Sequence, residues 1–282
     1  MDANETTLAP TDTMASLFIS HGAPTLPIED SPARAFFSEF GNSIPRPKAI
    51  VIASAHWDTN GVSVLSGSGT LSTIHDFYGF PSELYEMQYP APALGVLGDK
   101  VIGSLEDAGF KVELEQERGL DHGAWVPLKL MFPNADIPVA QISVNTARSP
   151  EYHWRLGRAL AALKNDDYLV IGSGTMTHNL GDVGDFHGEK NNFDEVTYVE
   201  EFSRWMEARL AANETNALLE YRERAPNAKR AHPTAEHILP FYIALGAAGV
   251  SWQANLIHRS CIYGVINLDA YAFHVARDPQ SH

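Results

Sequence analysis

Four short segments of the chain are almost continuously apolar, and each has the length of a β-strand. An apolar run of this kind is typical of a strand that is buried on both faces, as in a parallel sheet covered by helices. The pattern predicts strands at residues 14–20, 48–55, 137–144 and 167–174.

Segments in which apolar residues recur at helical spacing separate and follow these strands. A serine followed by proline, as at Ser31-Pro32 and Ser149-Pro150, is typical of the first residues of a helix. The spacing predicts helices at 31–41, 92–109, 124–132, 149–165, 193–212 and 236–249, and one or two strands within 251–275 that turn at Tyr263-Gly264.

The alternation of strands and helices predicts an α/β fold: a single domain with a mostly parallel central sheet flanked by helices, and an active site at the carboxyl ends of the strands. We expect this domain to span residues 14–282, after a disordered polar tail at 1–13. A length of 282 residues also leaves two smaller domains open.

Composition narrows the class of partner. The chain has 35 acidic and 20 basic residues, a formal net charge of −15, which argues against binding to nucleic acid or to an anionic membrane. A single cysteine, Cys261, excludes an internal disulfide and fits a reducing compartment. Without a signal-peptide pattern or an apolar run near 20 residues, the sequence predicts a cytoplasmic protein, and a homo-oligomer is compatible with it.

Histidines follow three of the predicted strands. His21 and His56 come at the ends of the first two strands, and His178 comes shortly after the strand at 167–174. Because ligands of open α/β sheets bind outside the carboxyl ends of the strands, these imidazoles would meet in one cleft if the strands are neighbours. Taken singly, a histidine at a strand end is usually a hydrogen-bonded turn residue.

Two more histidines, His122 and His237, open helical segments. Glu236 adjoins His237, and side chains of adjacent helical residues diverge by about 100°, so only one of the two should face the cleft. Clustered imidazoles suit Zn, Fe, Cu or Ni, although no H-E-x-x-H or C-x-x-C pattern is present. A weaker alternative is that the glycines of 172–175 cradle a phosphate.

Six short motifs occur in an order that resembles the class III extradiol ring-cleavage dioxygenases, and within that superfamily the 4,5-DOPA dioxygenase branch. The resemblance extends from about residue 15 to the C-terminus. The motifs are LFISHGAP (17–24), SAHW (54–57), HDFYGFP (75–81), GLDHGAWVPL (119–128), GSGTMTHNL (172–180) and HPTAEHILP (232–240).

The resemblance implies a mononuclear non-haem Fe(II) site with His21, His56 and His237 as metal ligands. Many members of the superfamily use two histidines and a glutamate, so Glu236 stays open as the alternative third ligand. The resemblance further implies that His178 is an acid/base residue beside the metal, or a fourth ligand when Zn(II) is bound. His122 would face the substrate as the second catalytic residue.

The implied reaction uses O₂ to open the aromatic ring of a catechol, DOPA-like or caffeate-like, and yields a muconic semialdehyde. The aromatic loop at 75–81 offers His75, Tyr78 and Phe80 as walls of the substrate pocket, or else a turn packed by its own aromatic rings. Asp121 is a candidate partner for a neighbouring imidazole. The alternatives are a zinc-dependent hydrolase on the same scaffold and a non-enzymatic binding protein.

Overall fold

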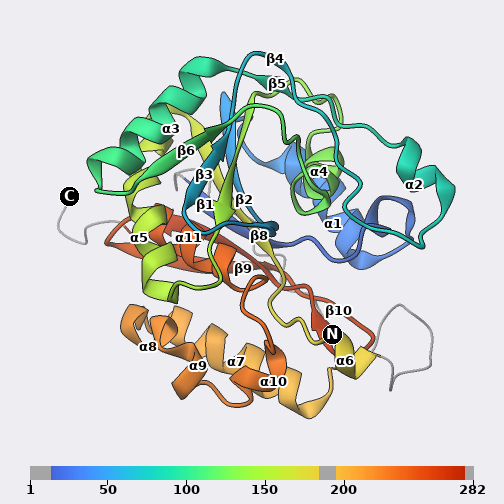
Figure 1. Cartoon of the computed structure of the whole chain (residues 1–282). Coiled ribbons are helices and arrows are strands. Elements are labelled where there is room, and N and C mark those ends of the chain that lie inside the picture. The colour runs from blue at the N-terminus through green and yellow to red at the C-terminus, as the bar shows by residue number, and fades with distance from the viewer. Residues whose placement is uncertain (1–13, 184–194, 277–282) are drawn as a thin grey trace.

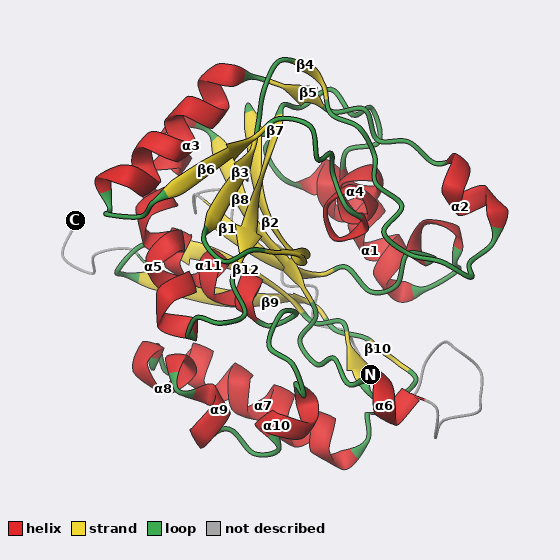
Figure 2. Cartoon of the chain, in the orientation of Figure 1, coloured by secondary structure: helices red, strands yellow, loops and turns green. Residues whose placement is uncertain are grey.

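The computed structural model describes residues 14–183 and 195–276, so the tail predicted at 1–13 lies outside the described residues (Figure 1). Eight strands form one central sheet, which the secondary-structure view shows between two groups of helices (Figure 2). From one edge to the other the strands are β6 (Val112–Glu115), β3 (Val62–Leu65), β7 (Val139–Val144), β2 (Ala49–Asp58), β8 (Tyr168–Gly174), β1 (Met14–Ser20), β12 (Ala270–Val275) and β9 (Trp252–His258).

The four central strands are parallel, and they are the four that the apolar runs predict. β7 pairs with β2, β2 with β8 and β8 with β1, all in parallel. At the edges the direction changes: β3 is antiparallel to β7, and β12 is antiparallel to both β1 and β9. The carboxyl ends of β1, β2 and β8 therefore lie next to each other at one end of the sheet, as the sequence predicts.

Alternate residues of β2 show why its sequence is apolar throughout. Val51 and Ala53 belong to the core beneath α3 (Gly95–Asp107), α5 (Pro150–Leu160) and α11 (Leu239–Ala247). Ile50 and Ile52 belong to the core on the opposite face, where α1 (Pro32–Ser43) and α4 (His122–Met131) pack (Figure 2). Each face of the sheet is covered, so the prediction of a parallel sheet flanked by helices is confirmed.

The C-terminal segment is more finely divided than the sequence suggests. It forms β9 and β12 of the main sheet and a small hairpin of β10 (Cys261–Ile262) and β11 (Ile266–Asn267) between them. Tyr263 and Gly264 have φ of 55° and 68°, the left-handed values that a tight hairpin turn needs, so the predicted turn is confirmed. A further pair, β4 (Gly69–Thr70) and β5 (Pro92–Ala93), lies outside the main sheet.

One long helix and three short ones lie beyond β9, and the sequence predicts only the long one. α7 (Thr197–Ala211) corresponds to the helix expected at 193–212, and it packs on β9. The three short helices beyond β9 are α8 (Thr215–Leu219), α9 (Tyr221–Arg224) and α10 (Ala228–Ala231) (Figure 1). The remaining short helices of the described residues are α2 (Ser82–Glu86), α6 (Leu180–Val183) and the 3₁₀ helices Leu26–Ile28 and Ala161–Asp166. No helix within 14–183 and 195–276 is long and apolar enough to cross a membrane.

Two glycines let α5 and α11 pack at very short range. A Cβ atom on Gly157 would lie 2.0 Å from the carbonyl oxygen of Ile243, and one on Gly246 would lie 2.1 Å from that of Trp154. Both clashes are with backbone, which cannot rotate away. This contact fixes α11, and α11 in turn packs against β8, β1 and β2.

We expect Gly157→Ala to lower the free energy of unfolding by about 3 kcal/mol, because the new methyl group overpacks a backbone contact. Urea denaturation measures the change. Gly103→Ala in α3 is the matched control, since no atom lies within 4 Å of its Cβ position; there we expect no loss and a gain of up to about 1 kcal/mol. Equal stability of the two variants would contradict the account.

Candidate metal centre

Two histidines meet near the carboxyl ends of β1 and β2, the two parallel strands that flank β8. His21 directly follows β1, and its backbone N–H donates to the carbonyl of Gly174 at the end of β8 (3.0 Å). His56 lies within β2, two residues before its end, because β2 continues to Asp58 past an irregularity in its pairing. The Nε2 atoms of His21 and His56 are 3.0 Å apart.

His237 approaches the same point from the face of β8 that α11 covers, just ahead of α11. Its ring centre is 5.5 Å from that of His21 and 5.0 Å from that of His56. His178 stacks on it, with ring centres 3.5 Å apart. The structure therefore brings together four of the predicted histidines, and His122 completes the group at 3.8 Å from the ring centre of His56.

Glycines in β8 make this approach possible. A Cβ atom on Gly174 would lie 2.0 Å from the carbonyl oxygen of His237, and one on Gly172 would lie 2.0 Å from that of Pro240. The backbone N–H of Thr175 donates to the same His237 carbonyl (3.0 Å). These glycines are buried against protein backbone, so the alternative in which residues 172–175 cradle a phosphate is wrong.

The hydrogen bonds of His21 define which of its nitrogens is free. Ser173 donates its hydroxyl proton to the carbonyl of Gly123, which can only accept. Ser173 Oγ must then accept from Nδ1–H of His21, 3.0 Å away. The Nε2 atom of His21 consequently carries a lone pair, and it faces Nε2 of His56.

Glu236 orients His237 in a similar way. Its Oε1 atom lies 3.1 Å from Nδ1 of His237 and accepts a hydrogen bond from the hydroxyl of Thr234 (2.9 Å). A carboxylate can only accept, so Nδ1 of His237 carries the proton and Nε2 is left as the free nitrogen. A histidine held by a carboxylate in this way is characteristic of metal ligands. The arrangement favours His237 over Glu236 as the residue that faces the cluster.

Burial keeps these imidazoles neutral. It lowers the pKa of His56 to about 3 and that of His178 to about 4, and it holds the pKa of His21 and His237 well below the usual value. At pH 7 all four therefore offer lone pairs rather than positive charge. The Nε2 lone pair of His21 and the neutral imidazole of His56, 3.0 Å away, are donors of the kind that bind a divalent cation, and the donor set contains nitrogen without thiolate.

His122 is positioned by a residue that the sequence analysis missed. Oδ2 of Asp76 lies 2.8 Å from Nδ1 of His122, and Oδ1 accepts from the His122 backbone N–H (2.9 Å). Oδ2 also lies 3.8 Å from Nδ1 of His56. The hydrogen bond to His122 offsets burial and lowers the pKa of Asp76 to about 2. The available signal was its place between His75 and Phe77 in HDFYGFP, the third of the six motifs.

The suggested role of Asp121 is wrong. Its buried carboxylate accepts from Ser54 Oγ (2.6 Å), Gln141 Nε2 (2.6 Å) and Arg118 Nη1 (3.0 Å) instead of from an imidazole. It also caps α4 by accepting from the backbone N–H of Ala124 (3.2 Å). Asp121 therefore fixes the start of the helix that carries His122.

The aromatic loop is largely packed on itself. His75 bonds through Nε2 to the carbonyl of Met87 (2.9 Å), and Phe80 packs against Phe77 with ring centres 5.4 Å apart. Tyr78 is 92% exposed, so it does not wall an enclosed pocket. The ring of this loop that approaches the cluster is Phe77, 5.9 Å from the ring centre of His122.

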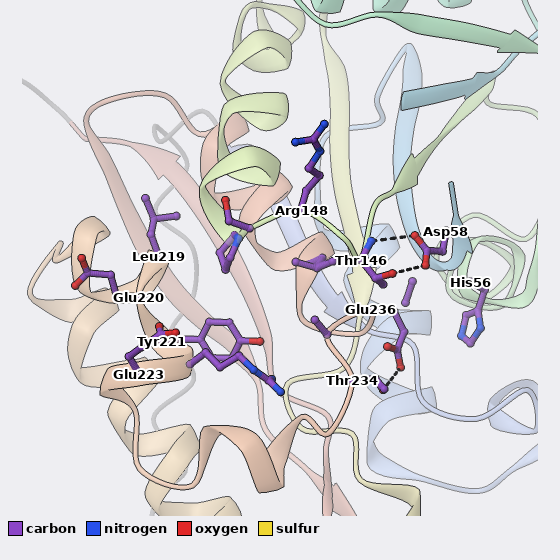
Figure 3. Close-up of a pocket in the computed structure, with 16 residues that line it drawn as sticks. His56, Asp58, Thr146, Arg148, Leu219, Glu220, Tyr221, Glu223, Thr234 and Glu236 are labelled. Carbon is purple, nitrogen blue, oxygen red and sulfur yellow. Dashed lines mark hydrogen bonds between the residues drawn. The ribbon is translucent and has the colours of Figure 1, made fainter. Parts of the chain in front are cut away.

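A cavity of about 850 Å³ opens beside the histidines. His56 and Glu236 line it next to the cluster, and residues of α9 line the opposite side (Figure 3). This volume is in the range of pockets that hold small organic molecules. The cluster therefore has an adjoining space for a substrate.

Comparison with known proteins places the chain in a family. Residues 15–273 match the family described as the catalytic LigB subunit of aromatic ring-opening dioxygenase. The chain is 41% identical over 263 residues to 4,5-DOPA dioxygenase extradiol of Beta vulgaris, covering 92% of this chain and 96% of that protein. It is 37% identical over 238 residues to 4,5-DOPA dioxygenase extradiol of Escherichia coli K12, covering 83% and 85%.

A solved structure is also similar. The crystal structure of an uncharacterized protein from Escherichia coli K12 superposes with a TM-score of 0.76 at 29% identity, covering 93% of this chain and all of that one. The chain belongs to the LigB family of aromatic ring-opening dioxygenases. It is an extradiol dioxygenase, a metal-dependent class that acts on a small molecule and O₂, and the resemblance seen in the sequence is confirmed.

We expect His237→Gln to bind less than a tenth of the metal that the unaltered protein binds, since one nitrogen donor is removed. Glu236→Gln is the matched control, because the amide oxygen can still accept from Nδ1 of His237. Metal content after dialysis against limiting metal, measured by inductively coupled plasma mass spectrometry, compares the two. If Glu236→Gln lost its metal and His237→Gln retained it, Glu236 and not His237 would be the metal ligand.

Proposed function

We propose that the protein is a non-haem Fe(II)-dependent dioxygenase that opens the ring of a catechol and yields a muconic semialdehyde. The observation that carries the proposal is the cluster formed by the neutral imidazoles of His21, His56 and His237, whose ring centres lie 5.0 to 5.5 Å apart, next to the cavity. In this proposal the three histidines hold the metal, and Glu236 keeps His237 in the correct tautomer.

The imidazole donors would accept either Fe(II) or Zn(II), and membership of a ring-opening dioxygenase family favours iron as the native metal, because Zn(II) has no redox chemistry. When bound, Fe(II) supplies adjacent coordination positions for the two catechol oxygens and for O₂, together with the redox chemistry that activates O₂. The zinc hydrolase and the non-enzymatic binding protein are less well supported, because the family and the named relatives are ring-opening dioxygenases.

The named relatives support a catechol such as DOPA as the substrate, and caffeate-like catechols belong to the same chemical class. In the reaction, a ring carbon–carbon bond beside the diol breaks, and both atoms of O₂ enter the product. The cavity beside His56 would hold the side chain of the catechol while the diol faces the histidines.

His178 is the proposed proton acceptor. Its imidazole is neutral at pH 7 because burial lowers its pKa to about 4, and it stacks at 3.5 Å on His237, beside the nitrogen cluster. It can therefore take a proton from a catechol hydroxyl at this position and return it to the substrate-derived oxygen later.

His122 is the proposed orienting residue. With Nδ1 held by Asp76 at 2.8 Å, its Nε2 atom is free to hydrogen-bond to a substrate oxygen beside His56. Asp76 is thereby a positioning residue, and the Phe77 ring lies against His122 with ring centres 5.9 Å apart.

Ring cleavage can be tested directly. We expect protein loaded with Fe(II) under anaerobic conditions to consume one O₂ per DOPA or caffeate when air is admitted, and to form a yellow product that absorbs in the near-visible range. An oxygen electrode and a diode-array spectrum follow both at once. Absence of O₂ uptake with every catechol, DOPA and caffeate included, would refute the proposed function.

His178→Ala tests the proton step separately. We expect it to retain iron and to lower kcat by about 10²–10⁴-fold, as loss of a general base does. His258→Gln is the control, because His258 lies in β9 and stacks on Phe36, away from the cluster; its kcat should stay within twofold. Near-normal turnover by iron-loaded His178→Ala would exclude the proposed role.

A further inference from the structure

The cavity beside the histidine cluster carries charges that ring cleavage itself does not require. Its lining includes two cationic side chains, Arg148 and Arg222, and four acidic ones. The acidic residues are Asp58, Glu220, Glu223 and Glu236. Because the cavity begins at His56 and Glu236, a catechol whose diol lies at the histidines would extend its side chain among these charges (Figure 3).

Three of the four carboxylates are already occupied. Asp58 accepts from the backbone N–H of Thr146 and also from its hydroxyl. Glu220 pairs with Arg224 (3.1 Å), and Glu236 accepts from Thr234 and His237. The carboxylate of Glu223 has no hydrogen bond or ion pair to another side chain within the described ranges 14–183 and 195–276.

Arg222 is held in place but is not neutralised. It donates from Nη1 to the carbonyl of His232 (2.9 Å) and from Nη2 to that of Pro233 (3.4 Å). A guanidinium has five N–H donors, so these two bonds leave others available. Within the part of the chain that the structure describes, no carboxylate forms an ion pair with it. Its contacts also tie α9 to the segment that leads into Glu236 and His237.

The other nearby arginines are less suited to bind a substrate. Arg224 is paired with Glu220 and does not line the cavity. Arg148 lines it but is exposed, with its guanidinium 5.5 Å from the ring centre of Tyr152. Arg222 is the half-buried cation with a fixed position, and a preoriented guanidinium matches the planar geometry of a carboxylate.

We infer that Arg222 and Glu223 select the substrate, with Arg222 binding a carboxylate on the catechol side chain and Glu223 binding an ammonium group next to it. Since four acidic residues outnumber two arginines in the lining, a side chain that carries only a negative charge is disfavoured overall, whereas a zwitterion can use both signs. This assignment rests on the proposed function, because it places the diol of a catechol at the histidine cluster.

Four catechols that differ only in their side-chain charges test the inference. DOPA carries both charges, 3-(3,4-dihydroxyphenyl)propanoate only the carboxylate, dopamine only the ammonium group, and 4-methylcatechol neither. For each one, kcat/KM is measured with the iron-loaded unaltered enzyme and with Arg222→Met, Glu223→Gln and Arg224→Met. Arg224→Met is the matched control, because Arg224 lies two residues away in the same helix and does not line the cavity.

We expect Arg222→Met to lower kcat/KM for DOPA and for the propanoate about 30-fold more than for 4-methylcatechol, the scale of a hydrogen bond to a charged group. Glu223→Gln should lower it for DOPA and dopamine about 10-fold more than for the other two. Arg224→Met should change the ratios between the four substrates by less than threefold. If Arg222→Met lowered kcat/KM equally for all four substrates, the inference would be overturned. Arg222 would then only stabilise the backbone at His232 and Pro233.

Isothermal titration calorimetry under anaerobic conditions gives a readout that does not depend on turnover. We expect Arg222→Met to weaken the binding of DOPA about 30-fold more than that of dopamine. If the unaltered protein binds DOPA in this Arg222-dependent way but cleaves no catechol, the proposed function fails and the selection by Arg222 stands. If DOPA binds equally well to the protein and to Arg222→Met, or to neither, the inference fails.

Discussion

The close packing of the segment before α11 against β8 is the contact on which the site depends. Gly174 leaves no room for a side chain between β8 and the carbonyl of His237, and Thr175 bonds to that carbonyl. His21 is attached to the same strand end through its own backbone N–H. Two segments that are more than 200 residues apart in the chain are thereby fixed on one strand, and their imidazoles meet without long flexible connections.

The second constraint is the state of the imidazoles. Burial removes their charge, and hydrogen bonds at Nδ1 decide which nitrogen remains free. Ser173 does this for His21, Glu236 for His237 and Asp76 for His122. With Nδ1 of His21 and of His237 held by acceptors, their Nε2 atoms keep lone pairs that a metal ion can bind.

Sequence alone predicted the central part of this structure well. Continuous apolar runs define β1, β2, β7 and β8 because each is buried on both faces, and the parallel order follows from the helices between them. The edge strand β6 and its neighbour β3 were missed because they have only four residues each, and β6 has no fully buried residue. The helices α8 to α10 are four or five residues long, too short to show a periodic pattern.

The same limit applies to the site. Histidines at strand ends can be predicted from the sequence, because a histidine that follows an apolar run is visible within a few neighbouring residues. Asp76 and Arg222 act through contacts with residues 46 and 10 positions away, and no local pattern encodes such a contact. The predicted roles of Asp121 and Tyr78 relied on proximity in sequence to a motif residue, and packing directs these side chains elsewhere.

The most direct test is anomalous diffraction from anaerobic crystals of the Fe(II)-loaded protein, recorded on both sides of the iron absorption edge. The account predicts one iron peak, bounded by the Nε2 atoms of His21, His56 and His237, with Glu236 still bonded to Nδ1 of His237. An iron peak coordinated by the carboxylate of Glu236, or located away from His21 and His56, would contradict it.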